Sequence, residues 1–330
     1  MGTIAKGRMK NTATTSIINQ PGLRFQARDA DVLQTIQNMG GVMAKRQLKA
    51  LFWPDKSKRT MEKRLAKLKS YAYIDWASLE QRRVNPNPEP VVWLDWKGAC
   101  YLAGLSGIKV DLPEKNNENR KRTLQKNLRM GGFSWLREPR WSQLYHDLTV
   151  IDVRLTFQHY CAQSGLIQLE EWINESEFRS RMDLVDVKFT TRQEKVITKK
   201  KGICPDGMLV LVDEKRRRLN QPFRARFLLE VDMATHDNLS FGWEKSLAGT
   251  AYIKSKAYRE RFGNNSGRWL VITTSDIRMK HLMKQTGEMI HKDADLFLFT
   301  TFQDFFSGNA LQERIWSKCD KDSKVSLFEE

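Results

Sequence analysis

The chain has 330 residues, a length that predicts two domains or one large one. Apolar residues make up 40% of it, which excludes a wholly disordered chain. The formal net charge of +17 is unevenly divided: residues 1–140 carry 27 basic and 12 acidic residues, and the rest carries 29 and 27. This asymmetry indicates a polyanion-binding region joined to a region with a different task.

Membranes and secretion are not expected. The sequence has no apolar run of about 18 residues, which a membrane-spanning helix needs, and its first twenty residues are polar, without the apolar core of a signal peptide. The four cysteines lie far apart and form no C-x-x-C pair, which excludes a zinc ribbon or a disulfide scaffold as the main organiser. We therefore expect a cytoplasmic protein with no membrane partner.

The first part of the chain has the pattern of a winged helix-turn-helix domain. Residues 1–22 form a basic tail, expected to be flexible, and the domain is expected over 23–107. The spacing of apolar residues predicts three helices, followed by two strands that a polar, proline-rich loop joins as a hairpin. The predicted elements are helices at 27–39, 44–52 and 57–70, strands at 71–78 and 91–95, and a closing helix at 96–105.

The third of these helices is basic on the face opposite its apolar residues. Residues 41–70 contain ten basic and two acidic residues. A helix fits the major groove and basic side chains neutralise phosphates, so we expect double-stranded DNA as the partner. The alternative is a solvated, lysine-rich helix in a winged fold that binds proteins. The candidate DNA contacts are Lys58, Arg59, Lys63, Arg64 and Lys67 on the helix, and Arg82 and Arg83 in the hairpin loop.

A second domain is expected over residues 141–310, after a basic linker at 108–140 and before a C-terminal tail at 311–330. The fold class predicted for the whole chain is mixed α/β (α+β), and the second domain has the order α-β-β-β-α-β followed by α-β. Lys199–Lys201 is expected at a hairpin turn. The predicted elements are helices at 141–163, 240–262 and 276–292, and strands at 167–173, 205–212, 226–233, 269–274 and 296–301.

Three carboxylates are expected to converge on two consecutive strands of this domain. Asp206 opens one strand, and Glu230 and Asp232 lie on one face near the end of the next. Converging carboxylates are costly without a cation, and hard oxygen ligands favour Mg²⁺ or Mn²⁺. Such a metal would polarise a phosphate and orient a nucleophilic water. Lys245, on the following helix, is a candidate cation for the transition state.

Less specific interpretations of these residues remain open. The carboxylates could form a salt-bridge cluster with Arg224, Arg226 or Lys245, or belong to a degenerate nuclease fold that only binds. His146 is a candidate catalytic residue, although a helical histidine is more often a core or interface residue. A covalent role for Tyr145 or Tyr252 has no support from the pattern.

From about residue 141 to 301, the order of elements and motifs resembles the PD-(D/E)XK nuclease fold. Pro205-Asp206 matches its first motif and Glu230-Val231-Asp232 its second, with Asp232 in the place of the usual lysine. In that superfamily the neighbouring helix can supply the lysine, which implies Lys245 as the replacement. The resemblance also implies an acidic metal ligand from the first core helix. The candidates for this ligand are Asp147 and Asp152.

From about residue 27 to 301, the chain also resembles the replication-relaxation family of mobile elements, which joins a winged helix to such a nuclease-like domain. The matching features are Arg28-Asp29, Phe52-Trp53-Pro54, Tyr145-His146-Asp147-Leu148, Asp152-Val153-Arg154, Pro205-Asp206-Gly207, Glu230-Val231-Asp232 with Thr235, and the Lys245–Tyr252 helix. The resemblance implies a nuclease-type relaxase of plasmid mobilisation, or a replication protein of a rolling-circle element, that makes a metal-dependent nick at an origin. Mobilisation, replication or transposition proteins are further expected partners.

Two alternatives to this function remain open. One is a non-catalytic, sequence-specific regulator of replication or transcription, which the non-standard Asp232 favours. The other is a transposon-end endonuclease that works with a transposase and shares the same chemistry.

Overall fold

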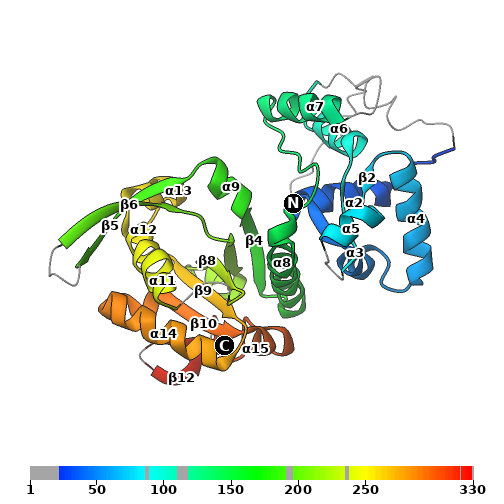
Figure 1. Cartoon of the computed structure of the whole chain (residues 1–330). Coiled ribbons are helices and arrows are strands. Elements are labelled where there is room, and N and C mark those ends of the chain that lie inside the picture. The colour runs from blue at the N-terminus through cyan, green and yellow to red at the C-terminus, as the bar shows by residue number, and fades with distance from the viewer. Residues whose placement is uncertain are drawn as a thin grey trace. The chain divides into compact units, whose positions relative to one another are not determined.

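A computed structural model describes residues 22–85, 89–109, 118–190, 196–234, 238–319 and 321–328 of the chain (Figure 1). The chain divides into two compact units, Met1–Leu148 and Thr149–Glu330, and the division falls inside helix α8 (Leu144–Ser164). The expected basic tail lies, except for Gly22, outside the described residues, as does Thr235. No helix in the described part of the chain is long and apolar enough to cross a membrane.

The N-terminal unit has the predicted helices and strands, with strand β1 as an unpredicted addition, around one small sheet. Strands β1, β3 and β2 pair antiparallel in that order. The helices bury apolar residues at helical spacing, such as Leu33 and Ile36 of α2 and Leu65 and Leu68 of α4. The elements are α2 (Ala27–Asn38), β1 (Val42–Ala44), α3 (Lys45–Phe52), α4 (Lys58–Ser70), β2 (Ile74–Asp75), α5 (Leu79–Val84), β3 (Val91–Leu94), α6 (Trp96–Leu105) and α7 (Glu118–Met130).

Besides β1, two segments of this unit differ from the sequence expectation. The predicted hairpin loop contains helix α5, because Ser78 and Gln81 form a capping box: the Ser78 hydroxyl accepts from the Gln81 N–H (3.1 Å), and the Gln81 side chain accepts from the Ser78 N–H (2.9 Å). The predicted basic linker contains helix α7, which buries Leu124 and Leu128 one turn apart. Arg82 and Arg83 therefore lie on a helix and not on a wing loop.

The described strands of the C-terminal unit form a seven-stranded sheet in the order β12-β11-β10-β9-β8-β7-β4, and β5 and β6 form a separate two-stranded ribbon. Strands β4, β7 and β8 pair antiparallel, whereas β8, β9 and β10 pair parallel. The elements after α8 are β4 (Ile167–Asn174), α9 (Glu175–Ser180), β5 (Asp183–Thr190), β6 (Val196–Ile203), β7 (Gly207–Asp213), α10 (Glu214–Arg218), β8 (Arg224–Asp232), α11 (Asn238–Phe241), the π-helical η2 (Gly242–Leu247), α12 (Ala248–Lys254), α13 (Lys256–Phe262), β9 (Arg268–Thr273), α14 (Asp276–Ile290), β10 (Phe297–Thr301), α15 (Phe302–Ser307), β11 (Trp316–Lys318) and β12 (Lys321–Val325).

Helices cover both faces of this sheet, as Figure 1 shows. Alternate residues of each strand enter separate apolar clusters, as the two-residue period of a strand requires. On β8, Phe227 and Leu229 pack toward α8 and α15, and Leu228 packs toward α12 and α14. Glu230 and Asp232 alternate with the buried Val231, so they point to the same face as Leu228.

The mixed α/β class and the predicted order of the main strands and helices are confirmed. The expected C-terminal tail is wrong: residues 316–318 and 321–325 add β11 and β12 to the sheet. Trp316 is fully buried there against Phe305, and its indole N–H donates to the Ala310 carbonyl (2.8 Å). Lys199–Lys201 lies within strand β6 and not at a turn.

Candidate active site and nucleic-acid interface

Asp206 and Glu230 lie side by side across strands β7 and β8. The backbone N–H of Asp206 donates to the Leu229 carbonyl (3.0 Å), and its Oδ2 accepts from the Val231 N–H (2.7 Å). These bonds attach Asp206 to the residues on either side of Glu230. Both carboxylates are buried, with 8% and 7% of each residue exposed. Two acidic groups so close together and so poorly hydrated need a cation.

Lys245 supplies one positive charge to this pair. Its Nζ donates to Glu230 Oε2 at 2.7 Å, and its side chain is 28% exposed. Burial alone would lower the pKa of Lys245, but the charges of Glu230 and Asp206 and the hydrogen bond outweigh it and raise the pKa well above its usual value. The lysine is therefore an ammonium at neutral pH. The structure thus brings Asp206, Glu230 and Lys245 into one cluster.

The helix that carries Lys245 has an unusual local geometry. Lys245 lies in the π-helical segment η2, and π turns are rare and occur frequently at functional sites. The segment packs tightly on α14. A Cβ on Gly242 would lie 3.1 Å from Met289 Cγ, and the hydroxyls of Ser246 and Thr286 are 2.8 Å apart. These contacts hold the segment in place, with Lys245 directed to the sheet.

Asp232 has a different set of partners. Its Oδ2 accepts from Arg278 Nε (2.9 Å) and from the Thr273 hydroxyl (2.6 Å), and its Oδ1 accepts from Arg278 Nη2 (2.9 Å). The Asp232 and Arg278 side chains are 5% and 12% exposed. A buried carboxylate is stabilised by a two-pronged guanidinium bond, and here α14 provides it.

The three carboxylates therefore do not act as one group. Among the described residues, no cluster of three or more His, Cys, Asp or Glu side chains is arranged to hold a metal ion. Asp206 and Glu230 share Lys245, and Asp232 is paired with Arg278. The expected convergence of all three is not found in that part of the chain.

His146 and Asp147 belong to the N-terminal unit, where Asp147 has another cation. The Asp147 carboxylate accepts from Arg140 Nη2 (2.5 Å) and Nε (3.2 Å), and His146 Nδ1 lies 3.7 Å from it. Asp152 lies in the C-terminal unit on α8 and is half-buried. Tyr252 is fully buried and donates its hydroxyl to Asp183 (2.6 Å), which keeps it in the core.

Helix α4 presents a basic stripe. Arg59, Lys63 and Lys67 follow one another at four-residue intervals and are all exposed, so they lie along one face of the helix. Lys58 is also exposed and lies 3.9 Å from Glu62. The stripe runs from Arg59 to Lys67 on the 13-residue helix α4.

Arg64 belongs to the interior of the unit and not to the stripe. It forms an ion pair with Asp29 of α2, which is 1% exposed, and its Nε donates to Asp29 Oδ1 at 2.7 Å. It therefore holds α4 on α2. Arg82 and Arg83 are exposed on α5, where they remain accessible to a ligand.

Sequence reasoning missed the contacts of two arginines, Arg278 and Arg154. No sequence pattern marked Arg278 as a functional residue, because an arginine in the first turn of a helix is common. Arg154 appeared only as part of a matching motif. It donates to Asn174 Oδ1 (3.2 Å) and lies 5.3 Å from the Trp172 ring, and burial lowers its pKa to about 10. Trp172 in turn packs against Gly207, next to Asp206.

Comparison with models of known protein families identifies the family of this chain. The model of the replication-relaxation family matches residues 33–265, well over half of the sequence and parts of both units. The chain belongs to the replication-relaxation family. Neither the curated proteins nor the solved structures contain a match. Membership of the replication-relaxation family suggests a role in the replication or mobilisation of mobile elements, and the match includes Asp206, Glu230 and Lys245.

Proposed function

We propose that this member of the replication-relaxation family is a metal-dependent, relaxase-like DNA endonuclease that nicks DNA at an origin or element end. The observation that supports the proposal is the cluster of Asp206, Glu230 and Lys245. Two buried carboxylates, one directly before β7 and one on β8, offer oxygen ligands to a metal, and a lysine from the next helix adds a positive charge. Metal-assisted phosphodiester hydrolysis uses groups of both kinds.

Asp206 and Glu230 fit Mg²⁺ or Mn²⁺ by the chemistry of their oxygen atoms. Mg²⁺ is usually held by one or two carboxylates, with water molecules and substrate phosphates completing its shell. Two carboxylates are therefore enough, and neither Asp232 nor Asp147 is required. When bound, the metal would polarise the scissile phosphate and lower the pKa of a bound water.

Lys245 and Arg278 have separate tasks in this proposal. The Lys245 ammonium donates to Glu230 and is placed to stabilise charge that develops on the phosphate. Arg278 pairs with Asp232 and ties the end of β8 to α14. Asp232 thus has a structural role, in the place where the PD-(D/E)XK pattern has its lysine.

Two basic elements would hold the DNA. In the N-terminal unit, the α4 stripe of Arg59, Lys63 and Lys67 suits phosphate contacts beside the major groove. In the C-terminal unit, the β5–β6 ribbon carries the exposed Lys188 and Lys200, and β6 continues through Cys204 and Pro205 to Asp206. A two-stranded ribbon also fits the major groove. Asp206 therefore directly follows the β5–β6 ribbon in the chain, and Figure 1 shows this ribbon as a two-stranded arm.

One observation favours the alternative of a non-catalytic DNA-binding regulator. The ion pair of Asp232 with Arg278 leaves two carboxylates near Lys245 instead of three. The regulator would bind DNA tightly and in a salt-dependent way but would not cleave it. The transposon-end endonuclease shares the proposed chemistry and differs only in its partner protein.

The test is nicking of a supercoiled plasmid that carries the origin of the element, with Mg²⁺ or Mn²⁺ and with EDTA. We expect the wild type to produce open-circular DNA only with the metal, and Glu230→Gln to lose this activity. Glu260→Gln, which replaces an exposed carboxylate on α13 with 62% side-chain exposure, is the matched control and should nick normally. Tight DNA binding by the wild type without nicking in any divalent ion, and without heat on titration with Mn²⁺, would support the regulator instead.

A further inference from the structure

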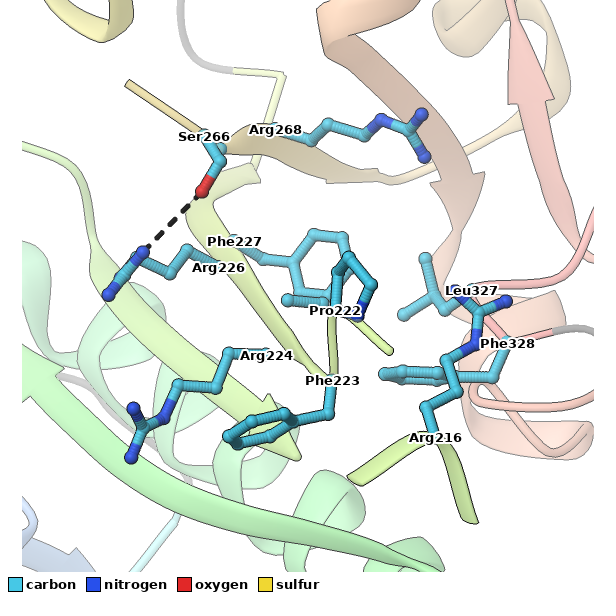
Figure 2. Close-up of a pocket in the computed structure, with 12 residues that line it drawn as sticks. Arg216, Pro222, Phe223, Arg224, Arg226, Phe227, Ser266, Arg268, Leu327 and Phe328 are labelled. Carbon is cyan, nitrogen blue, oxygen red and sulfur yellow. Dashed lines mark hydrogen bonds between the residues drawn. The ribbon is translucent and has the colours of Figure 1, made fainter. Parts of the chain in front are cut away.

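A pocket of about 290 Å³ lies at the opposite end of β8 from Glu230 (Figure 2). The start of β8, the residues just before β8 and β9, and the segment around Leu327 line it. Four of its twelve lining residues are arginines and none is acidic. A concave surface with this composition attracts an anion.

The four arginines differ in how much of their charge is already compensated. Arg224 makes two bonds of 2.7 Å with Glu170, and Arg216 Nε lies 3.5 Å from Asp213 Oδ2. Arg226 donates to the neutral acceptors Asn264 (2.9 Å) and Ser266 (3.4 Å). The Arg268 side chain is exposed and has no hydrogen-bond or ion-pair partner in the described ranges. Arg226 alternates with Phe227 along β8, so its side chain points to the other face of the sheet. Arg268 is therefore the arginine that leaves positive charge without a carboxylate beside Phe227.

The floor beside Arg268 is apolar. Arg268 is the register partner of Phe227, so both point to the same face of the sheet. Phe227 and Phe328 are 4% and 9% exposed. Figure 2 shows Arg268 and Arg216 on two sides of a floor formed by Phe227, Leu327 and Phe328. The pocket therefore offers a guanidinium and an apolar surface to one ligand.

We propose that this pocket binds a nucleotide, with its phosphate at Arg268 and its base against the apolar floor. The guanidinium fork matches a phosphate group, and aromatic side chains support bases of any sequence. The volume is close to the lower limit of small-molecule pockets, roughly 300 Å³, which suits one nucleotide and excludes a duplex.

The nucleotide pocket is a second site, separate from the cluster of Asp206 and Glu230. Phe227 and Glu230 are three residues apart on β8, about 10 Å along the strand, and their side chains point to opposite faces of the sheet. The nucleotide could be free or part of an unpaired DNA strand. Binding of an unpaired DNA strand rests on the proposed function, whereas binding of a free nucleotide does not.

The test measures binding to the full-length protein in EDTA, so that cleavage plays no part. The ligands are dTMP and dATP, a single-stranded oligonucleotide that contains 5-iodouracil, the same sequence as a duplex, and inorganic phosphate. We expect Arg268→Gln to weaken nucleotide binding about tenfold, as loss of a charged hydrogen bond does. Arg314→Gln, which replaces an exposed arginine outside the pocket, should bind as the wild type does.

Two measurements distinguish binding of a free nucleotide from binding of a nucleotide within a DNA strand. Saturable binding of dTMP or dATP that depends on Arg268 indicates a free nucleotide. Photo-crosslinking of the oligonucleotide to residues 222–228 or 327–328, lost in Arg268→Gln, indicates a DNA strand. Binding of neither ligand, binding that Arg268→Gln leaves unchanged, or inorganic phosphate binding as tightly as the nucleotides would overturn the proposal. None of these outcomes depends on whether the protein nicks DNA.

Discussion

Removal of the Arg278 guanidinium should destabilise the C-terminal unit strongly. Arg278→Met keeps the apolar stem of the side chain but leaves Asp232, which is 5% exposed, with the Thr273 hydroxyl, the Ala234 N–H and no cation. Removing one partner of a buried ion pair costs about 3–5 kcal/mol, because the other charge stays buried and uncompensated. For a unit of this size, about 3 kcal/mol lowers Tm by about 6–12 °C.

A double-variant cycle gives this prediction its control. Asp232→Asn together with Arg278→Met removes both charges, so the pair should recover most of the stability that Arg278→Met loses. Thermal and urea unfolding of the four proteins, followed by circular dichroism, measures the coupling. A Tm for Arg278→Met within about 2 °C of the wild type, or a double variant less stable than Arg278→Met, would refute the view that Asp232 is a buried charge held by Arg278.

Two further predictions concern activity and DNA binding. Lys245→Met should lower the single-turnover nicking rate by about 10²–10³ and leave DNA affinity unchanged, as loss of one positioned charge does; an unchanged rate would remove Lys245 from the mechanism. Replacing Arg59, Lys63 and Lys67 together by alanine should reduce the slope of log K for DNA binding against log salt concentration by about 2.7 if each contacts a phosphate. Arg64→Ala should instead destabilise the N-terminal unit, because it leaves the buried Asp29 without its cation. Fluorescence anisotropy at several salt concentrations measures the salt dependence of DNA binding, and an unchanged slope for the triple variant would contradict the role of the stripe.

Patterns within one strand or helix predicted much of the fold and part of the site. The alternation along β8 placed Glu230 and Asp232 on one face, because a strand has a period of two. The spacing of Leu65 and Leu68 likewise gave the buried side of α4. The pairing of β7 with β8 then followed from their order in the chain, so Asp206 could be expected beside Glu230.

Partners from distant parts of the chain could not be predicted. Arg278 is 46 residues from Asp232, and Arg64 is 35 residues from Asp29, so no local pattern links either pair. The same holds for Trp316, since three residues of β11 carry too short a pattern to indicate a strand. Tertiary packing decides which carboxylates face a lysine and which face an arginine, and that choice separates Glu230 from Asp232.

The most direct test of the proposed active site compares two aspartates of the same sheet, both buried. In Asp206→Asn the amide oxygen could still accept from the Val231 N–H, and in Asp232→Asn it could still accept from Arg278, so both variants should fold. Asp232→Asn should be the less stable of the two, because Arg278 loses its carboxylate, and nicking is therefore measured well below its Tm. The account predicts that Asp206→Asn abolishes Mg²⁺-dependent nicking of supercoiled origin DNA, whereas Asp232→Asn nicks at a rate near that of the wild type. Equal nicking by Asp206→Asn and the wild type, or loss of nicking in Asp232→Asn alone, would contradict it.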